Sequence, residues 1–327
     1  MKGVLDMLNS SIRIIKKYAV ALLIVAICIA SIVLMQIKAI NSELEVKAPD
    51  YHFYFIAQSA TDPFWEKVEE GVRQAASDFN VYVEYVSPRF SNANEAYKYL
   101  DIATISDVDG IITYVPRLEA YSHRIDLADE KKIPVITIDS DASSSKRQVY
   151  IGSNSYNFGK EAAKLVYEST AGIAKIAVIS NEDIGNDTIE YDLKMRGFID
   201  FLKEQPRMKI EKVYTSQMGV ISAEEITQDI ISNHPDVNAI LTLSASDTLG
   251  SARLIVDRNR VGKVKLVGTG SSDKINDYIN KGIIHSTIES DGYSMGYKSI
   301  ETMININKGL YSPTYIYTQI NIQKKRR

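Results

Sequence analysis

Polar and aromatic side chains suited to ligand binding follow the predicted buried strands of this 327-residue chain. A carboxylate is a charge-assisted hydrogen-bond acceptor, and a flat aromatic ring buries the apolar face of a ligand whose hydroxyl groups reach polar partners. We therefore look for ligand-binding residues in the segments that follow the strands. The segments are residues 58–65, 114–117, 139–141, 180–191, 244–247, 269–272 and 289–291.

Motifs for catalysis and for cofactor binding are missing from the sequence. Gly268, Thr269 and Gly270 lack the third glycine of a dinucleotide-binding turn, and there is no phosphate-binding loop of the GxxxxGK type. The four histidines do not have the spacing of metal ligands, and no serine lies in a GxSxG turn. The sequence therefore predicts no enzyme, no cofactor and no metal site.

Alternating strands and amphipathic helices place the polar segments at the edges of parallel sheets. Residues 51–57 are apolar and aromatic, as in a buried strand, and residues 64–79 have apolar side chains at helical spacing after start signals at Asp62 and Pro63. In such sheets ligands bind beyond the carboxyl ends of the strands. Further strands are predicted at residues 81–86, 110–114, 134–138, 176–180, 210–214, 239–243, 265–268 and 285–288. This pattern predicts an α/β fold with two doubly wound parallel-sheet lobes.

An uncharged apolar stretch at residues 18–37 predicts one transmembrane helix. At a rise of ~1.5 Å per residue it spans a hydrocarbon core of ~30 Å. Arg13, Lys16 and Lys17 precede it, which places the N-terminus in the cytoplasm. A cleaved signal peptide has a shorter apolar stretch followed by small residues, and a lipoprotein anchor needs a small residue where Ile27 precedes Cys28. We therefore expect an uncleaved anchor in the cell membrane, with the rest of the chain outside the cytoplasm.

The charge balance gives no reason to expect nucleic acid as a partner. The formal net charge is -3, and the basic clusters lie near the two ends of the chain. Lys324 to Arg327 are expected to form a solvated tail. The single cysteine excludes an intrachain disulfide, so full-sized hydrophobic cores must stabilise the fold.

Six short segments resemble the type I periplasmic sugar-binding proteins, the ribose/galactose-binding group, over residues 51–322. Each segment is weakly specific alone, and their order and spacing together carry the resemblance. They are Asp62-Pro63-Phe64-Trp65, residues 108–112 (VDGII), residues 133–139 (IPVITID), Arg196-Gly197-Phe198, Thr248-Leu249-Gly250 and residues 293–297 (YSMGY). With the apolar N-terminal stretch, the chain looks like a membrane-anchored variant of this family.

The resemblance implies two lobes, joined by three hinge strands, that close on a monosaccharide-sized ligand. The crossings are expected near Ser153–Asn154, Ser290–Asp291 and residues 310–315, and residues 291–308 are expected to form a helix returned to the first lobe. The implied domains are a cytoplasmic segment (1–17), the anchor (18–37), a stalk (38–49), a first lobe (50–153 and 291–311), a second lobe (154–290 and 312–323) and the tail (324–327).

The resemblance also implies a set of ligand-binding residues in the first lobe. The family uses the aspartate at the position of Asp139 to accept two sugar hydroxyls, although a turn aspartate would have the same place in the sequence. Phe64 and Trp65 match an aromatic pair that lies against the sugar ring, and the alternative is that both belong to the buried side of the first helix. Asp62, where the family usually has asparagine, either accepts a sugar hydroxyl or caps that helix. Asp141 and Tyr114 complete the first-lobe candidates.

The second lobe departs from the family pattern. Asp192 replaces an arginine or asparagine, and Ser290 replaces a glutamine or similar residue. An asparagine–aspartate pair becomes Ser244 and Ala245, and an aspartate becomes Gly270. A sugar would lose several hydrogen bonds, each worth about 0.5–1.5 kcal/mol net. Besides Asp192 itself, the candidate second-lobe residues are Asn186, Tyr191, Gln217, Ser246, Asp247 and Glu289.

Two functions from different classes fit this sequence. The first is a solute-binding protein that closes on a small ligand, favoured to be a monosaccharide, and signals to a membrane histidine kinase or chemoreceptor; the anchor favours this function. The second is the substrate-binding component of a carbohydrate ABC transporter, for which a secreted or lipid-tethered protein would serve equally well or better. An interaction protein with a degenerate pocket is a third possibility. In the first two the ligand favours the closed form and shifts the population towards it.

Overall fold

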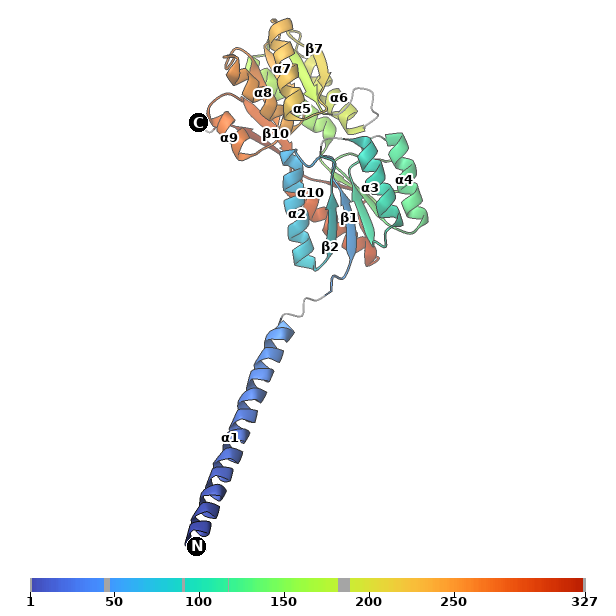
Figure 1. Ribbon diagram of the computed structural model, residues 1–327. Coiled ribbons are helices and arrows are strands. Elements are labelled where there is room, and N and C mark those ends of the chain that lie inside the picture. The colour runs from blue at the N-terminus through green and yellow to red at the C-terminus, as the bar shows by residue number, and fades with distance from the viewer. Residues whose placement is uncertain (1, 44–47, 90–91, 117, 182–188, 326–327) are drawn as a thin grey trace. The chain divides into compact units, whose positions relative to one another are not determined.

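The computed structural model describes residues 2–43, 48–89, 92–116, 118–181 and 189–325. The chain divides into two compact units, Met1–Ala48 and Pro49–Arg327. The first unit contains the long helix α1 (Lys2–Glu43), and the second contains two α/β lobes (Figure 1).

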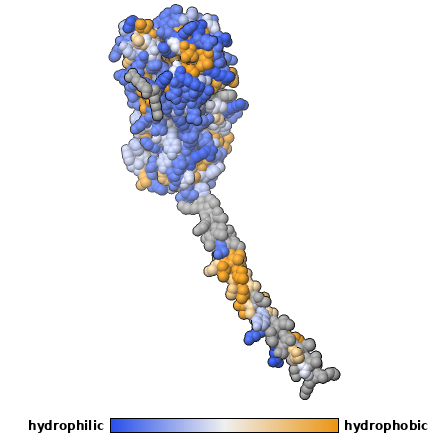
Figure 2. All heavy atoms as spheres, turned by 90° about the vertical axis from the view of Figure 1, so that its left-hand side faces the viewer, coloured by the Kyte–Doolittle hydropathy of each residue, from blue (hydrophilic) through white to orange (hydrophobic). Residues whose placement is uncertain are grey.

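Helix α1 contains the predicted apolar segment. Among the described residues, Lys16–Gln36 is the one stretch long and apolar enough to cross a membrane, and none of it is buried (Figure 2). The helix continues to Glu43, so the first part of the predicted stalk is helical, while residues 44–47 lie outside the described residues.

The first lobe is built on a six-stranded parallel sheet with the order β11-β5-β4-β3-β1-β2. The strands are β1 (His52–Ile56), β2 (Tyr82–Val86), β3 (Gly110–Thr113), β4 (Val135–Ile138), β5 (Val149–Gly152) and β11 (Tyr315–Tyr317). Helices α2 (Pro63–Phe79) and α10 (Gly292–Asn307) cover one face, and α3 (Ala93–Ile105) and α4 (Leu118–Glu130) cover the other (Figure 1).

The second lobe has the same architecture, with the sheet order β12-β10-β9-β8-β6-β7. The strands are β6 (Ala174–Ser180), β7 (Met208–Thr215), β8 (Ala239–Thr242), β9 (Lys265–Thr269), β10 (Ser286–Ser290) and β12 (Ile320–Lys324). Of these, β12 runs antiparallel to β10 and the others are parallel. Helices α5 (Ser155–Thr170) and α6 (Ile189–Lys203) pack on one face, and α7 (Val220–Asn233), α8 (Ala245–Asp257) and α9 (Asp273–Asn280) pack on the other.

Both faces of each sheet are buried, which explains the near-continuous apolar strands in the sequence. In β1, Phe53 and Phe55 point into the cluster beneath α2 and α10, while Tyr54 and Ile56 point into the cluster beneath α3 and α4. Helices α2 and α10 lie so close that a Cβ atom on Gly296 would be 2.1 Å from the backbone oxygen of Val68. The crossing of these helices therefore requires a glycine.

The register of the strands aligns their carboxyl ends at the cleft between the lobes. Ile56 lies opposite both Val86 and Thr113, and Thr113 lies opposite Thr137. The loops that follow β1, β3 and β4 therefore begin side by side. The second lobe is arranged in the same way, with Ile179 opposite Thr242.

The chain crosses three times between the lobes, and one crossing differs from the prediction. The crossings after β5 and after β10 lie at the predicted positions, and α10 packs on the first lobe as expected. The third was predicted at residues 310–315, with residues 312–323 in the second lobe. This boundary is wrong because β11 pairs with β5 of the first sheet, so the chain crosses between Tyr317 and Ile320.

The C-terminal residues and the short strands also correct the prediction. Lys324 belongs to β12 and contacts Glu168 on α5, so it is part of the second lobe and not of a solvated tail. Strands β5, β11 and β12 were not among the predicted strands. The two-lobe fold itself is confirmed.

Candidate functional site

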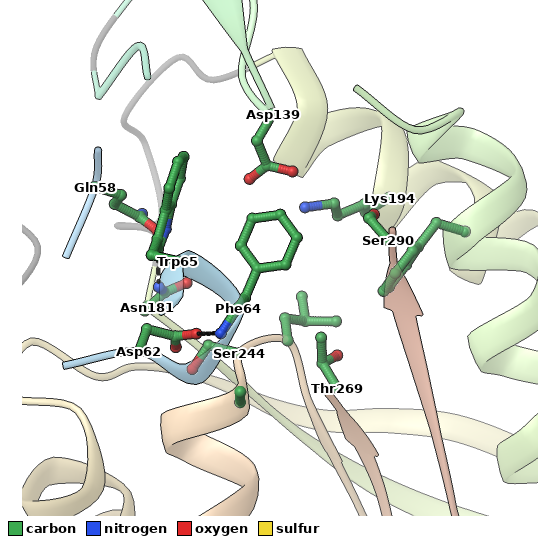
Figure 3. Close-up of a pocket in the computed structure, with 13 residues that line it drawn as sticks. Gln58, Asp62, Phe64, Trp65, Asp139, Asn181, Lys194, Ser244, Thr269 and Ser290 are labelled. Atoms are coloured by element: carbon green, nitrogen blue, oxygen red, sulfur yellow. Dashed lines mark hydrogen bonds between the residues drawn. The ribbon is translucent and has the colours of Figure 1, made fainter. Parts of the chain in front are cut away.

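A cavity lies in the cleft between the two lobes (Figure 3). It contains about 460 Å³ of space free of protein atoms, part of it open to solvent. Both lobes contribute to its wall, as expected for a ligand site at the carboxyl ends of two parallel sheets. The lining residues are Gln58, Asp62, Phe64, Trp65 and Asp139 from the first lobe and Phe158, Asn181, Lys194, Leu243, Ser244, Ala245, Thr269 and Ser290 from the second.

The start of helix α2 forms one wall of the cavity. Asp62 is the N-cap residue, and its Oδ1 accepts a hydrogen bond of 2.9 Å from the backbone N–H of Phe64. Pro63 occupies the first helical turn, where its missing N–H costs nothing. This local geometry presents the rings of Phe64 and Trp65, which meet edge to face at 5.3 Å, to the cavity.

A chain of hydrogen bonds holds the Trp65 ring in place. The indole N–H donates to Gln58 Oε1 at 3.2 Å, and Gln58 Nε2 donates to the Tyr114 hydroxyl at 2.8 Å. Tyr114 is buried beneath Trp65, with ring centroids 5.7 Å apart. Tyr114 therefore supports the aromatic wall from behind.

Asp139 occupies a tight turn directly after β4. Its backbone is left-handed, with φ of 62°, and the N–H of Ser140 donates across it to the Ile138 carbonyl at 2.7 Å. Aspartate tolerates this conformation better than most residues, and backbone strain of this kind is often found at functional sites. The Tyr150 hydroxyl donates to the Asp139 carbonyl at 3.1 Å, which fixes the turn. The result is a carboxylate directed into the cavity.

Lys194 of α6 brings a cation to the same space from the opposite lobe. Figure 3 shows its ammonium group and the Asp139 carboxylate directed towards one another above the Phe64 ring. Burial raises the pKa of Asp139, and the positive charge of Lys194 opposes that rise. The Lys194 Nζ also lies 5.5 Å from the centre of the Phe158 ring. A hydrogen-bond acceptor and a donor, both charged, therefore meet over aromatic surface.

Small side chains form the rest of the second-lobe wall. Ser244 and Thr269 contribute hydroxyl groups, and Ala245 contributes a methyl group. Gly270 has a φ of 93°, and a Cβ atom there would lie 2.5 Å from the Ala245 Cβ. A longer side chain at residue 270 is thus excluded by backbone conformation and by Ala245 together.

Direct contacts between the lobes close the cleft around the cavity. The second carboxylate oxygen of Asp62 accepts hydrogen bonds from Ser246 of α8, at 3.1 Å from its hydroxyl and 3.3 Å from its backbone N–H. Lys67 of α2 forms an ion pair of 3.0 Å with Glu289 of β10. Further contacts join Gln58 to Asn181 at 3.4 Å and Ser140 to Glu190 at 3.1 Å. These contacts join the two lobes on both sides of the cavity.

Four of the residues predicted from the sequence line this cavity, namely Asp62, Phe64, Trp65 and Asp139. For Asp62 the structure shows the capping role directly, and its carboxylate also faces the cavity. Burial raises the pKa of Asp62, while the hydrogen bonds from Phe64 and Ser246 lower it. These four residues remain the first-lobe candidates for ligand contact.

Asp141 does not reach the cavity. It is buried and forms a two-pronged ion pair with Arg147, with N–O distances of 2.6 and 2.7 Å, and it also accepts a hydrogen bond from Thr137. Its oxygens therefore stabilise the loop that follows Asp139. The prediction that Asp141 contacts ligand is not supported by this geometry.

The second-lobe candidates that the structure describes are also absent from the wall of this cavity. Asp192 is exposed on α6, and Tyr191 is buried in the same helix. Asp247 is fully buried beneath the start of α8, where it accepts a hydrogen bond from Ser216, and burial raises its pKa to about 7. Glu289 pairs with Lys67, and burial raises its pKa while Lys67 opposes the rise. Asn186 lies outside the described residues.

Sequence reasoning missed several lining residues. Gln58, Asn181 and Thr269 fall in segments that follow strands, but nothing in the sequence separated them from their neighbours, and Ser244 was noted only as a departure from the family pattern. Lys194 and Phe158 lie within helices, beyond those segments. Where the family often has an arginine at the position of Asp192, the cation that lines this cavity is Lys194, two residues further along α6. In the described part of the chain, no group of three histidine, cysteine or acidic residues could hold a metal ion.

Comparisons with known proteins agree with this architecture. The periplasmic binding protein domain family model matches residues 53–310. The crystal structure of GanP, a glucose-galactose binding protein from Geobacillus stearothermophilus, is 31% identical, with a TM-score of 0.78 over 84% of this chain and 97% of that chain. The XylFII-LytSN complex contains a chain 28% identical, with a TM-score of 0.78 over 85% and 98%. The ABC transporter periplasmic-binding protein YphF of Escherichia coli (strain K12) is 25% identical over 81% of this chain and 83% of its own length.

Proposed function

The chain belongs to the periplasmic binding protein domain family, and from that premise we propose that it is a membrane-anchored protein that closes on a monosaccharide and signals to a membrane sensor such as a histidine kinase. Its relatives are solute-binding proteins, so it is a binding protein and not an enzyme. The binding domain of this family is extracytoplasmic.

The observation that carries the ligand proposal is the meeting of Asp139 and Lys194 from opposite lobes. A sugar hydroxyl is both a donor and an acceptor, so it can bond the carboxylate and the ammonium group at once. Phe64 and Trp65 offer ring faces to the apolar C–H side of a pyranose. A ligand that joins both lobes in this way favours the closed form.

The charges in the cavity favour a neutral ligand. The Asp62 carboxylate accepts hydrogen bonds at the N-termini of two helices, α2 and α8, where the helix dipole favours negative charge. The Asp139 carboxylate faces Lys194. Each acidic group is thus compensated by the protein, and a ligand that brought a further charge would disturb this balance.

Isothermal titration calorimetry on the full-length chain tests this proposal. We expect saturable binding of at least one neutral pentose or hexose, and weaker binding of the matching uronic acid and amino sugar. Stronger binding of a charged sugar would contradict the charge argument. No binding of any sugar would contradict the ligand proposal.

The sensor role rests on the N-terminal helix and on one relative. An uncleaved anchor at Lys16–Gln36 would hold the binding domain beside a membrane partner. The XylFII-LytSN structure is a complex of a 28% identical protein with another protein. The partner of the present chain would then bind one lobe arrangement better than the other, which couples ligand binding to signalling.

A specific comparison favours a second candidate function. The 25% identical relative from Escherichia coli is named as an ABC transporter periplasmic-binding protein. In that role the closed form would deliver its sugar to a permease. The ligand site would be the same, and the partner would differ.

Photo-crosslinking in native membranes separates the two roles. A crosslinking residue introduced at exposed positions on each lobe should capture a histidine kinase or related sensor. The amount of captured sensor should change when sugar is added. Capture of a permease subunit would favour the transport role and overturn the sensor role.

A further inference from the structure

The cavity has two ends that differ in chemistry. Figure 3 shows Ser244 and Thr269 on one side of the Phe64 ring and the Asp139 carboxylate on the other. Ser244 is the N-cap residue of α8, and Thr269 is the last residue of β9. We call the wall that these two residues form with their neighbours the second-lobe end of the cavity, and it comprises Leu243, Ser244, Ala245 and Thr269.

The serine and threonine hydroxyl groups of the second-lobe wall already bond the protein. The Thr269 hydroxyl donates to the last carbonyl of β8 at 2.8 Å, and the Ser290 hydroxyl donates to the Ser153 hydroxyl at 2.8 Å. The Ser244 oxygen accepts from the backbone N–H of Asp247 at 3.1 Å. Burial raises the pKa of Asp247, and a hydrogen bond from the Ser244 hydroxyl opposes that rise. Since a hydroxyl has one proton to donate, these three groups offer a ligand no free donor.

The other polar groups from the second lobe lie towards different parts of the cavity. The Asn181 amide donates to Gln58 Oε1 at 3.4 Å, on the side of the cavity that Figure 3 shows beside Trp65. The Lys194 ammonium group is directed towards Asp139. Among the described lining residues, the charged groups that can bond ligand hydroxyls are therefore gathered at the Asp139 end.

Leu243 and Ala245 give the second-lobe end a carbon surface. Leu243 is partly buried and packs against the apolar cluster beneath α5 and α6, and Gly270, directly after Thr269, adds no side chain. A ligand hydroxyl against this surface would lose its bonds to water without gaining a partner, which is unfavourable. A methyl group in the same place would gain from burial. The second-lobe end therefore suits a methyl group.

We infer that the ligand is a 6-deoxyhexose, a neutral monosaccharide with a methyl group where an ordinary hexose has a hydroxymethyl group. The assignment depends on the proposed sugar-binding function and names the substrate class of the same site. In a pyranose the C2 and C3 hydroxyls lie across the ring from the methyl group on C5. The hydroxyls bind Asp139 and Lys194, and the methyl group contacts Leu243 and Ala245.

Calorimetry on the full-length chain with matched sets of three sugars tests the inference. Each set contains a 6-deoxyhexose, its parent hexose and the pentose that lacks C6. The sets are D-fucose, D-galactose and L-arabinose; L-fucose, L-galactose and D-arabinose; 6-deoxy-D-glucose, D-glucose and D-xylose; and L-rhamnose, L-mannose and L-lyxose. In at least one set the 6-deoxyhexose should bind ~10-fold more tightly than its parent, because the parent buries a hydroxyl without a partner. It should bind ~4-fold more tightly than the pentose, because a methyl group is buried.

A substitution in the second-lobe end locates the methyl group. Leu243→Asn places an amide against C6, so the ratio of 6-deoxyhexose affinity to parent-hexose affinity should fall ~10-fold. Leu249→Asn is the matched control, because Leu249 is also partly buried and does not line the cavity. It should leave the ratio unchanged. A ratio of two affinities measured on one variant does not depend on how stable that variant is.

The outcomes separate this inference from the proposed function. If the parent hexose or the pentose binds at least as tightly as the 6-deoxyhexose in every set, the inference is overturned and the sugar-binding function stands. The inference is also overturned if Leu243→Asn and Leu249→Asn give the same ratio. Silence towards all sugars of the four sets overturns both the inference and the proposed sugar ligand.

Discussion

The carboxylate of Asp62 joins the two lobes by accepting hydrogen bonds in both. Its Oδ1 accepts from the backbone of its own helix α2, and its Oδ2 accepts from the hydroxyl and N–H of Ser246 at the start of α8, at 3.1 and 3.3 Å. One buried side chain therefore caps a helix in the first lobe and contacts the first turn of a helix in the second. Because this contact joins the two lobes, we expect it to favour closure of the cleft.

Replacing Asp62 by asparagine should separate these two roles. Asparagine and aspartate are equally good N-caps, so the stability of the ligand-free protein should change little. The amide NH₂ would face two donors on Ser246, which removes a charge-assisted interaction worth about 1.5–3 kcal/mol in the closed form. Asp62→Asn should therefore weaken sugar binding ~10-fold or more, as measured by calorimetry.

Ser246→Ala is the matched change on the other lobe, since Ser246 does not line the Asp139 cavity. It should weaken monosaccharide binding by a smaller factor, because the backbone N–H of residue 246 still donates to Asp62. In the double variant the two effects should not add, since the partners are in direct contact. Unchanged affinity in both single variants would show that this contact does not favour closure.

Asp141 should matter for folding and not for ligand recognition. Asp141→Ala leaves the buried Arg147 without its carboxylate partner, which costs about 3–5 kcal/mol of unfolding free energy. Thermal or urea unfolding of the ligand-free protein measures this loss. The double variant Asp141→Leu with Arg147→Met removes both charges and should recover most of the stability. A stable Asp141→Ala variant with lost sugar binding would place Asp141 in the ligand site after all.

Asp247 should make stability depend on pH. Burial raises its pKa from 3.8 to about 7, the hydrogen bonds from Ser216 and Ser244 oppose the rise, and the charge of Asp62 adds to it. A carboxyl whose pKa is raised in the folded state stabilises the fold while it is protonated, so that contribution is lost as the pH rises from about 4 through about 7. Its Oδ2 has no hydrogen-bond partner among the described residues, which agrees with a carboxyl that favours the neutral form.

Asp247→Asn removes this titration and keeps an acceptor for Ser216. The Tm of the variant minus the Tm of the wild type should increase by at least ~2 °C when the pH is raised from 5 to 8. Asp257→Asn, an exposed change on the same helix, should show no such trend. A difference that is constant with pH would mean that Asp247 does not titrate in this range.

The first-lobe site was predictable because its residues lie in the segments that follow strands. Asp139 comes directly after β4, and Phe64 lies in the first turn of α2, after the loop that follows β1, where the topology of a parallel sheet places the ligand. Lys194 was missed because it lies in the second turn of α6 and reaches the cavity only through the packing of that helix. Asp141 differs from Asp139 because it forms an ion pair with Arg147. The spacing of residues in the sequence does not reveal this pair.

The parts of the fold that were mispredicted are short and depend on distant partners. Strand β11 has three residues, and its place in the first sheet is set by pairing with β5, more than 160 residues earlier in the chain. Glu289 follows the pattern of a strand-end ligand, yet it pairs with Lys67, 222 residues away. Contacts of this kind join segments that are far apart in the sequence and have no local signal.

The most direct test of the account is calorimetric titration of the wild-type chain and of Asp139→Ala with neutral pentoses and hexoses. We expect saturable binding in the wild type, and binding ~100-fold weaker or absent in the variant because its charged acceptor is lost. Asp139→Asn, which tolerates the left-handed backbone, should also bind weakly, and Asp107→Ala, an exposed change in the same lobe, should bind normally. Equal binding by Asp139→Ala and wild type, or no binding of any sugar by the wild type, would contradict the assignment of this cleft as a sugar site.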